Sequence, residues 1–101
     1  MPRCCLWVEF ELKPGAWAAF NAIMREHRDK TLAEEGGCRQ FDILHPELTG
    51  GHIDESRVML YEVYDDHAAL ATHNAGPRMP QVGAALAPLK SRQTVALFAL
   101  D

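Results

Sequence analysis

The chain has 101 residues and a formal net charge of −4, from 10 lysines and arginines against 14 aspartates and glutamates. This length predicts a single domain over residues 1–101, and a mildly acidic chain without a basic run is a poor binder of nucleic acid. Because no apolar stretch is long enough to span a bilayer and the first residues lack a secretory signal, we expect a cytoplasmic protein without membrane contacts.

The first part of the chain predicts a strand followed by a long helix. Residues 4–12 alternate between apolar and polar side chains, as a strand does, and Lys13-Pro14-Gly15 ends it. From residue 16 to residue 35 the apolar period becomes helical, and one stripe carries Trp17, Phe20, Ile23, Met24, His27 and Thr31. We expect Gly36 and Gly37 to end this helix and to supply a left-handed residue, which a Cβ disfavours.

The second part predicts three more strands and a helical crossover. Strands are expected over residues 38–45 and 57–64, with a polar surface loop between them. Asp65 or Asp66 then caps a short helix over residues 67–75. A last strand is expected over residues 94–100, preceded by one more helical segment around Pro88, which is marked by Met79, Val82, Leu86 and Leu89.

The order β-α-β-β-α-β predicts an α+β, ferredoxin-like fold. Helices cover one face of such a sheet, so the other face should be polar in a monomer. The third strand is instead apolar on both sides, with Val58, Leu60 and Tyr64 on one face and Met59, Tyr61 and Val63 on the other. We therefore expect a homodimer in which a second copy of the sheet covers the free face.

Two carboxylates interrupt these strands and are candidate functional groups. Glu62 shares a face with Leu60 and Tyr64, where a carboxylate must be paired, hydrogen-bonded or shifted in pKa. It is either an acid–base group or substrate anchor in a pocket, or one half of a salt bridge across the sheet. Asp42 makes a weaker case of the same kind, because it lies nearer a strand end.

The histidines and cysteines show no metal-binding pattern. His67 and His73 are six residues apart and lie on different faces of their helix, with His73 on the inward side. His27 lies on an apolar stripe, where a histidine is more often a buried core residue than a catalyst. The cysteines lack disulfide or zinc spacing and are expected to be buried hydrophobes: Cys4, Cys5 and Cys38. With no nucleotide-binding loop either, we expect no metal and no flavin cofactor.

Two segments carry a resemblance to a known family. Residues 34–44 read EEGGCRQFDIL, and residues 59–73 read MLYEVYDDHAALATH. These segments resemble E-x-G-C-x-x-F-D-V-L and Y-E-x-Y-x-D-x-x-A-L-x-x-H of the antibiotic biosynthesis monooxygenase family, in the same order. The resemblance covers nearly the whole chain.

The resemblance implies a dimeric α+β barrel with a pocket in each protomer between the sheet and the helices. Many members of this family oxidise quinols or polycyclic phenols with molecular oxygen and without metal or flavin. By match to the motifs, the expected catalytic residues are His73 and Glu62. Tyr61 and Asp42 are carried over as substrate-binding positions.

Three further residues are candidates for binding the substrate. Tyr64 is suited to an aromatic pocket lining, and His27 faces inward from the long helix. Arg78 stands where family members often have a second histidine, and its guanidinium is suited to an anionic oxygen. Residues 4–12 contain no asparagine, which haem-degrading relatives use on the first strand, so haem degradation is not expected.

Three functions are compatible with these residues. The first is a cofactor-independent monooxygenase in which His73 or Glu62 deprotonates the hydroxyl of a small quinol or phenol. The second is an isomerase or lyase acting on a small hydroxy-ketone or sugar phosphate, with Arg78 binding the anionic group. The third is a non-catalytic dimer that binds a small ligand. The fold alone does not decide among them.

Overall fold

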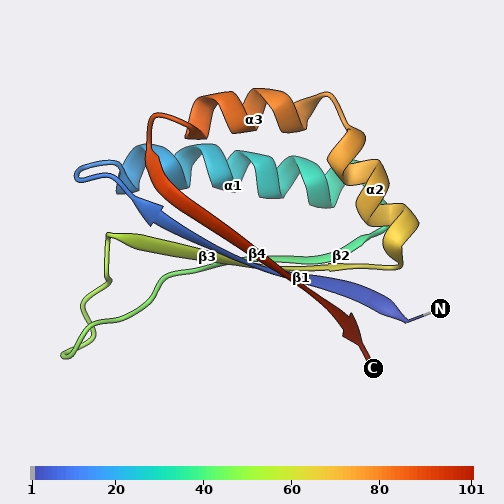
Figure 1. Ribbon diagram of the computed structural model, residues 1–101, viewed down its shortest axis with the longest axis horizontal. Coiled ribbons are helices and arrows are strands. Elements are labelled where there is room, and N and C mark those ends of the chain that lie inside the picture. Colours follow the sequence, from blue (N-terminus) through green and yellow to red (C-terminus); the bar gives the residue numbers. More distant parts are fainter. Residues whose placement is uncertain (1) are drawn as a thin grey trace.

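One antiparallel sheet is the centre of the computed structural model, which describes residues 2–101 (Figure 1). Its strand order is β2-β3-β1-β4, so β1 and β3 are central and β2 and β4 form the edges. The elements are β1 (Arg3–Leu12), α1 (Trp17–Glu34), β2 (Cys38–Leu44), β3 (Arg57–Tyr64), α2 (His67–Ala75), α3 (Arg78–Leu86) and β4 (Lys90–Leu100). The predicted α+β, ferredoxin-like order is confirmed, with the second crossover divided between α2 and α3.

The helices lie on one side of the sheet, with α1 and α3 side by side above it and α2 at one end (Figure 1). Strand alternation decides which side chains face them: Val8 and Phe10 of β1 lie opposite Leu60 and Val58 of β3 and point toward the helices. Phe20 of α1 packs edge-on against Phe10, with ring centroids 4.8 Å apart. The hydrophobic core therefore lies between this face and α1.

The opposite face of the sheet carries no helix among residues 2–101 (Figure 1). The middle of this face is apolar. Trp7 lies opposite Tyr61 on one side and Ala96 on the other. The edge strand β4 leaves Phe98 53% exposed on this face. The sheet thus presents apolar side chains on both faces, as the sequence predicted. We call the helix-free side the outer face.

The boundaries differ from the sequence predictions mainly around α3 and β4. Pro80 lies inside the first turn of α3, where backbone N–H groups have no acceptor within the helix, so the N–H that proline lacks is not needed. Helix α3 ends before Pro88. β4 begins at Lys90, four residues earlier than predicted, because its polar first residues pair with the end of β1 as far as Leu12. None of the helices described in residues 2–101 has the length and apolarity needed to cross a membrane.

The left-handed helix end predicted at Gly36 or Gly37 is wrong. Neither glycine has a positive φ. The last residue of helix α1 is Glu34, and the capping residue after it, Glu35, is extended, with φ −111° and ψ 97°. Glu35 donates its N–H to the carbonyl of Thr31 at 2.9 Å.

Gly37 is required for a different reason, which is the close approach of α2. A Cβ built on Gly37 would lie 2.6 Å from the Cβ of Ala69, well inside van der Waals contact. The carbonyl of Gly37 also accepts the N–H of Asp65 at 2.9 Å, which ties this loop to the end of β3. A glycine here brings the end of α1 against the first turn of α2.

The Gly37→Ala substitution should therefore destabilise the protein by about 1–3 kcal/mol, the usual penalty of overpacking, as measured by urea unfolding. Gly36→Ala is the matched control, because a Cβ at Gly36 meets nothing within 4 Å and should leave stability nearly unchanged. Ala69→Gly in the Gly37→Ala background should recover part of the loss. Equal stability of the two single variants would contradict this role for Gly37.

Candidate active site

A cavity of about 260 Å³ lies between the helix side of the sheet and helices α1, α2 and α3. Its walls are mostly apolar and come from Leu6, Val8, Phe10, Met24, Leu60, Met79, Val82, Leu86 and Val95. The polar side chains on it are His27, Glu62, His73, Asn74, Lys90 and Gln93. This combination of apolar walls with a few convergent polar groups is typical of a small-molecule site.

Glu62 projects into this cavity from β3 and is 4% exposed. Tyr64, two residues further on the same strand face, donates its hydroxyl to Oε1 of Glu62 at 2.6 Å. Burial raises the pKa of the Glu62 carboxyl, while the Tyr64 hydrogen bond and the nearby His73 act in the opposite direction. The candidate salt bridge across the sheet is absent among residues 2–101, so the carboxylate is hydrogen-bonded rather than ion-paired.

His73 reaches the same cavity from α2. Asp66 caps this helix, as the sequence predicted, by accepting the N–H of Ala69 at 2.8 Å. The His73 side chain is 3% exposed, and its Nδ1 lies 2.8 Å from Oε1 of Glu35. The structure thus places Glu62 and His73 on one cavity, from different elements of the fold.

His27 is the third buried titratable group on the cavity. Its ring lies 5.3 Å from the ring of His73 and meets Phe41 edge-on at 5.6 Å. Burial, followed by the positive charges of His73 and Arg78, lowers the pKa of His27 to about 4. At neutral pH this imidazole is therefore uncharged.

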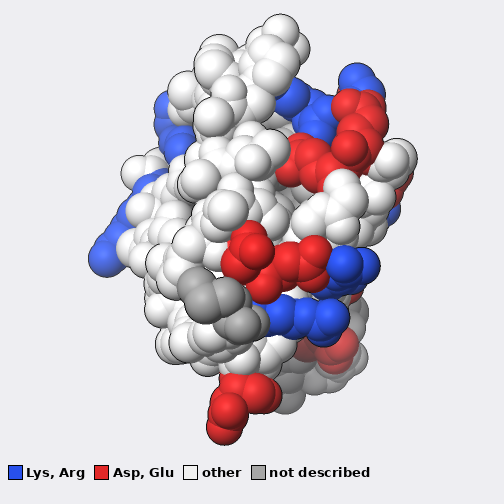
Figure 2. Space-filling model, turned by 90° about the vertical axis from the view of Figure 1, so that its right-hand side faces the viewer, with Lys and Arg blue, Asp and Glu red and all other residues white. Residues whose placement is uncertain are grey.

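Arg78 does not line the cavity, although the sequence indicated it as an anion-binding residue. It begins α3 and donates from Nη2 to Oε2 of Glu35 at 2.8 Å and from Nη1 to Oε1 of Glu34 at 3.0 Å. These carboxylates engage both terminal nitrogens of its guanidinium, whereas the buried Nε has no hydrogen-bond partner among residues 2–101. Figure 2, which faces the end of the molecule that carries α2, shows acidic and basic side chains gathered together there.

Of the other predicted substrate-binding residues, His27 lies on the cavity, whereas Tyr61, Asp42 and Tyr64 are absent from its lining. Tyr61 precedes Glu62 on a strand, so it must point to the outer face, and Asp42 lies opposite it there. Tyr64 is fully buried, so it affects the site through its hydrogen bond to Glu62 and not by contacting a ligand in the cavity. In a single protomer, Tyr61 and Asp42 are therefore not available to a ligand held by His73.

Sequence reasoning missed several polar groups near the cavity. Lys90 and Gln93 lie on the part of β4 that precedes the predicted strand, and Asn74 follows His73 directly. Glu35 belongs to the first of the two motif segments but received no role, because its contact with His73 spans 38 residues of sequence. Among residues 2–101, no three His, Cys, Asp or Glu side chains are placed to share a metal ion.

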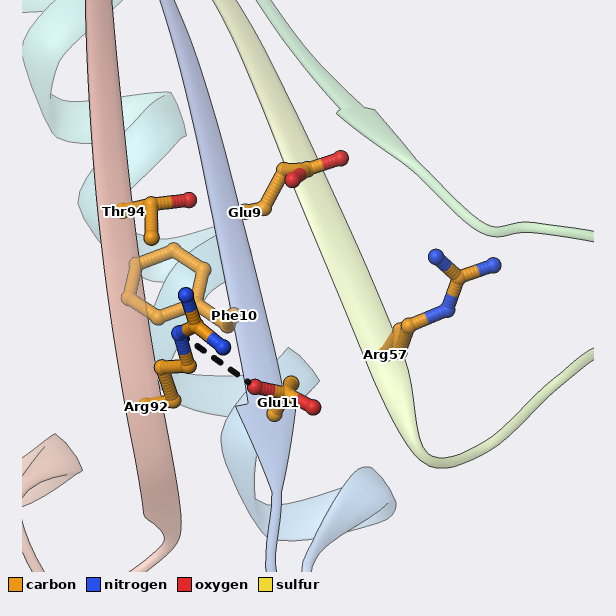
Figure 3. Close-up of a pocket in the computed structure, with 6 residues that line it drawn as sticks. All are labelled: Glu9, Phe10, Glu11, Arg57, Arg92 and Thr94. Carbon is orange, nitrogen blue, oxygen red and sulfur yellow. Dashed lines mark ion pairs between the residues drawn. The ribbon is translucent and has the colours of Figure 1, made fainter.

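A second hollow, of about 220 Å³, lies on the outer face between β1, β3 and β4 (Figure 3). Its charged side chains are Glu9, Glu11, Arg57 and Arg92, and Arg92 pairs with Glu11 at 3.7 Å. The Arg92 side chain is 70% exposed and that of Glu11 52%, so water screens the pair. The desolvated groups that acid–base chemistry needs lie in the helix-side cavity instead.

The low pKa of His27 predicts a loss of stability in acid. The unfolded chain takes up a proton near the ordinary value of 6.5, before the folded protein does near 4, so the free energy of unfolding falls as the pH drops between these values. The loss from this residue is at most about 3 kcal/mol. His27→Gln should flatten the pH dependence of urea unfolding, whereas His52→Gln, in an exposed loop, should not. Parallel curves for wild type and His27→Gln would refute this assignment.

Comparison with known proteins agrees with this architecture. Residues 5–84 match the sequence profile of the family described as antibiotic biosynthesis monooxygenase. A Caulobacter crescentus protein provisionally named an antibiotic biosynthesis monooxygenase is 19% identical with a TM-score of 0.87, covering 99% of this chain and 91% of its own. A variant of SnoaB, a cofactor-independent oxygenase of Streptomyces nogalater, is 18% identical with a TM-score of 0.80, covering 98% and 93%.

A third similar structure is a dimeric protein of unknown function with a ferredoxin-like fold from Bacteroides fragilis. It is 15% identical with a TM-score of 0.76, covering 97% of this chain and 96% of its own. At these identities the three structures establish the fold, and the profile match over residues 5–84 establishes the family. The chain therefore belongs to the antibiotic biosynthesis monooxygenase family.

Proposed function

We propose that this protein is a cofactor-independent monooxygenase that oxidises a small quinol or phenol with molecular oxygen. The observation that carries the proposal is the presence of two buried titratable groups, Glu62 and His73, on one largely apolar cavity. Membership of the antibiotic biosynthesis monooxygenase family supports it, as does the shared fold of SnoaB, a cofactor-independent oxygenase.

The size and lining of the cavity favour a small aromatic substrate. Its volume of about 260 Å³ lies just below the roughly 300–1,000 Å³ of pockets that hold drug-sized ligands. Apolar side chains from the sheet and from α3, such as Val8, Leu60 and Leu86, suit the faces of a ring. A single ring or a compact bicyclic quinol fits such a space better than a long polycyclic phenol.

The polar groups supply the acid–base chemistry. His73 takes the proton of a substrate hydroxyl, and the anion that remains is rich enough in electrons to reduce oxygen. One oxygen atom enters the product and the other leaves as water, and the four electrons that the oxygen molecule accepts all come from the substrate, which leaves as a quinone. Glu62, which accepts the Tyr64 hydroxyl, orients the substrate hydroxyl, and the apolar walls exclude water from the anion.

The isomerase or lyase alternative is less well supported by the geometry. It requires an anion-binding group beside the base, and Arg78 is bound to Glu34 and Glu35 outside this cavity. Lys90, the cation that lines the cavity, is hydrogen-bonded to Gln93. Proton exchange into a hydroxy-ketone without oxygen consumption would favour that alternative. Ligand binding without either reaction would favour a non-catalytic binding protein.

His73→Ala should lower turnover by roughly 10²–10⁴-fold, as expected for loss of a general base, in oxygen-uptake assays over a panel of small quinols. His67→Ala is the matched control, since His67 is an exposed histidine on the same helix. Glu62→Gln keeps the shape of the side chain and should mainly shift the pH profile. Unchanged turnover in His73→Ala would rule out His73 as the base.

The protein should also form a homodimer through the outer face of its sheet. Trp7, Tyr61 and Phe98 make this face apolar at its centre, and isolated proteins seldom leave such a surface in water. A second copy offers the same surface by two-fold symmetry. The protein of similar fold from Bacteroides fragilis, which is described as dimeric, supports a dimeric state.

Sedimentation velocity at micromolar concentration should therefore show a dimer. The interface should bury more than about 1,000 Å² of surface in total, as a stable pair requires. Phe98→Glu should shift the protein to monomer, because it places a charge on the outer face without disturbing the core. Leu48→Glu, at an equally exposed residue in the loop before β3, should leave the dimer intact. A monomeric wild type would contradict the proposed assembly.

A further inference from the structure

Glu35 links the three helices behind the cavity. It follows the last residue of α1, and its carboxylate lies between His73 of α2 and Arg78 of α3. Oε1 lies 2.8 Å from Nδ1 of His73, and Oε2 accepts Nη2 of Arg78 at 2.8 Å. The Glu35 side chain is 22% exposed, so both contacts are largely shielded from water.

These contacts determine which nitrogen of His73 carries the proton. An ionised carboxylate only accepts hydrogen bonds, so the hydrogen of a neutral His73 must be on Nδ1. Arg78 only donates, and its contact occupies the second oxygen of the Glu35 carboxylate, so Oε1 is left as the acceptor for His73. Nε2 of His73 then holds a lone pair, and no residue within 2–101 donates to it. The ring lines the cavity, where this lone pair can accept a proton.

We propose that Glu35 is a positioning residue that holds His73 in the Nδ1-protonated form, with Nε2 ready to accept a proton from a ligand in the cavity. The inference rests on the proposed role of His73 as a base and adds the group that prepares it. On proton transfer the O–H bond of the ligand breaks and an N–H bond forms at Nε2. The resulting imidazolium lies against the Glu35 carboxylate, which stabilises its charge.

Other titratable groups also face His73, but their contacts with it differ from that of Glu35. Glu62 and Tyr64 approach from β3, and His27 approaches from α1. None of these three is hydrogen-bonded to the His73 ring, and Arg78 reaches it only through Glu35. Glu35 is therefore the group that fixes the orientation and tautomer of the imidazole.

The decisive variant is Glu35→Gln. The Arg78 guanidinium attracts the amide oxygen of the new side chain, which turns the amide NH₂ toward Nδ1 of His73. An NH₂ group can donate only to a nitrogen that carries a lone pair, so Nδ1 of His73 must be unprotonated in this variant. The ring hydrogen then lies on Nε2, which can no longer accept a proton from a ligand in the cavity. ¹⁵N NMR of histidine-labelled protein should show the protonated and unprotonated nitrogens of His73 exchanged relative to wild type, with the fold retained.

Turnover provides the second readout. Glu35→Gln should lower kcat at least roughly tenfold, with little change in KM, and should alter the pH profile. Glu34→Gln is the matched control, because Glu34 bonds the other nitrogen of Arg78 and does not touch His73. It should leave the His73 nitrogen signals and kcat unchanged.

The two readouts separate the inference from the proposed function. If wild type consumes no oxygen with any quinol while Glu35→Gln still exchanges the His73 nitrogens, the proposed function fails and the positioning role stands. If Glu35→Gln leaves the His73 signals and the pH profile as in wild type, the positioning role is overturned, whatever the turnover.

Discussion

Burying the Glu62 carboxylate inside an antiparallel sheet is the constraint on which this site depends. A charge there would be costly without a partner, and the strand period supplies one, because Tyr64 lies on the same face and donates at 2.6 Å. His73 reaches the same space from α2, where Asp66 fixes the start of the helix. The close contact of Gly37 with Ala69 holds α2 against the end of α1, which brings Glu35 to His73.

Much of the fold and part of the site could be predicted from local patterns. Period-two alternation placed Glu62 on the same strand face as Leu60 and Tyr64, and an apolar stripe placed His27 inward. The roles of Glu35 and Gly37 could not be predicted, since each depends on a contact with α2 that no local pattern encodes. Motif matching carried over Tyr61 although strand alternation turns it away from Glu62, which is why the match and the geometry disagree there.

The two faces of the sheet have separate tasks. The helix side carries the cavity, and the outer face carries an apolar surface around Trp7, on which Phe98 is 53% exposed. Because neighbouring residues of a strand point to opposite faces, Glu62 and Tyr61 serve different surfaces although they are adjacent in sequence. The edge strand β4 contributes to both, with Val95 on the cavity and Phe98 on the outer face. The proposed assembly and the proposed chemistry therefore both draw on β1, β3 and β4.

The central claim is that the cavity holds a base that ionises a phenolic hydroxyl. The most direct measurement is the absorbance of 4-nitrophenol bound to the protein without oxygen, because its ionised form has a distinct visible band. In wild type the bound phenol should ionise at a lower pH than the free phenol, since His73 accepts its proton beside Glu35. In His73→Ala, the bound phenol should stay protonated over the same pH range. A wild-type protein that binds the phenol with unchanged ionisation would contradict the account.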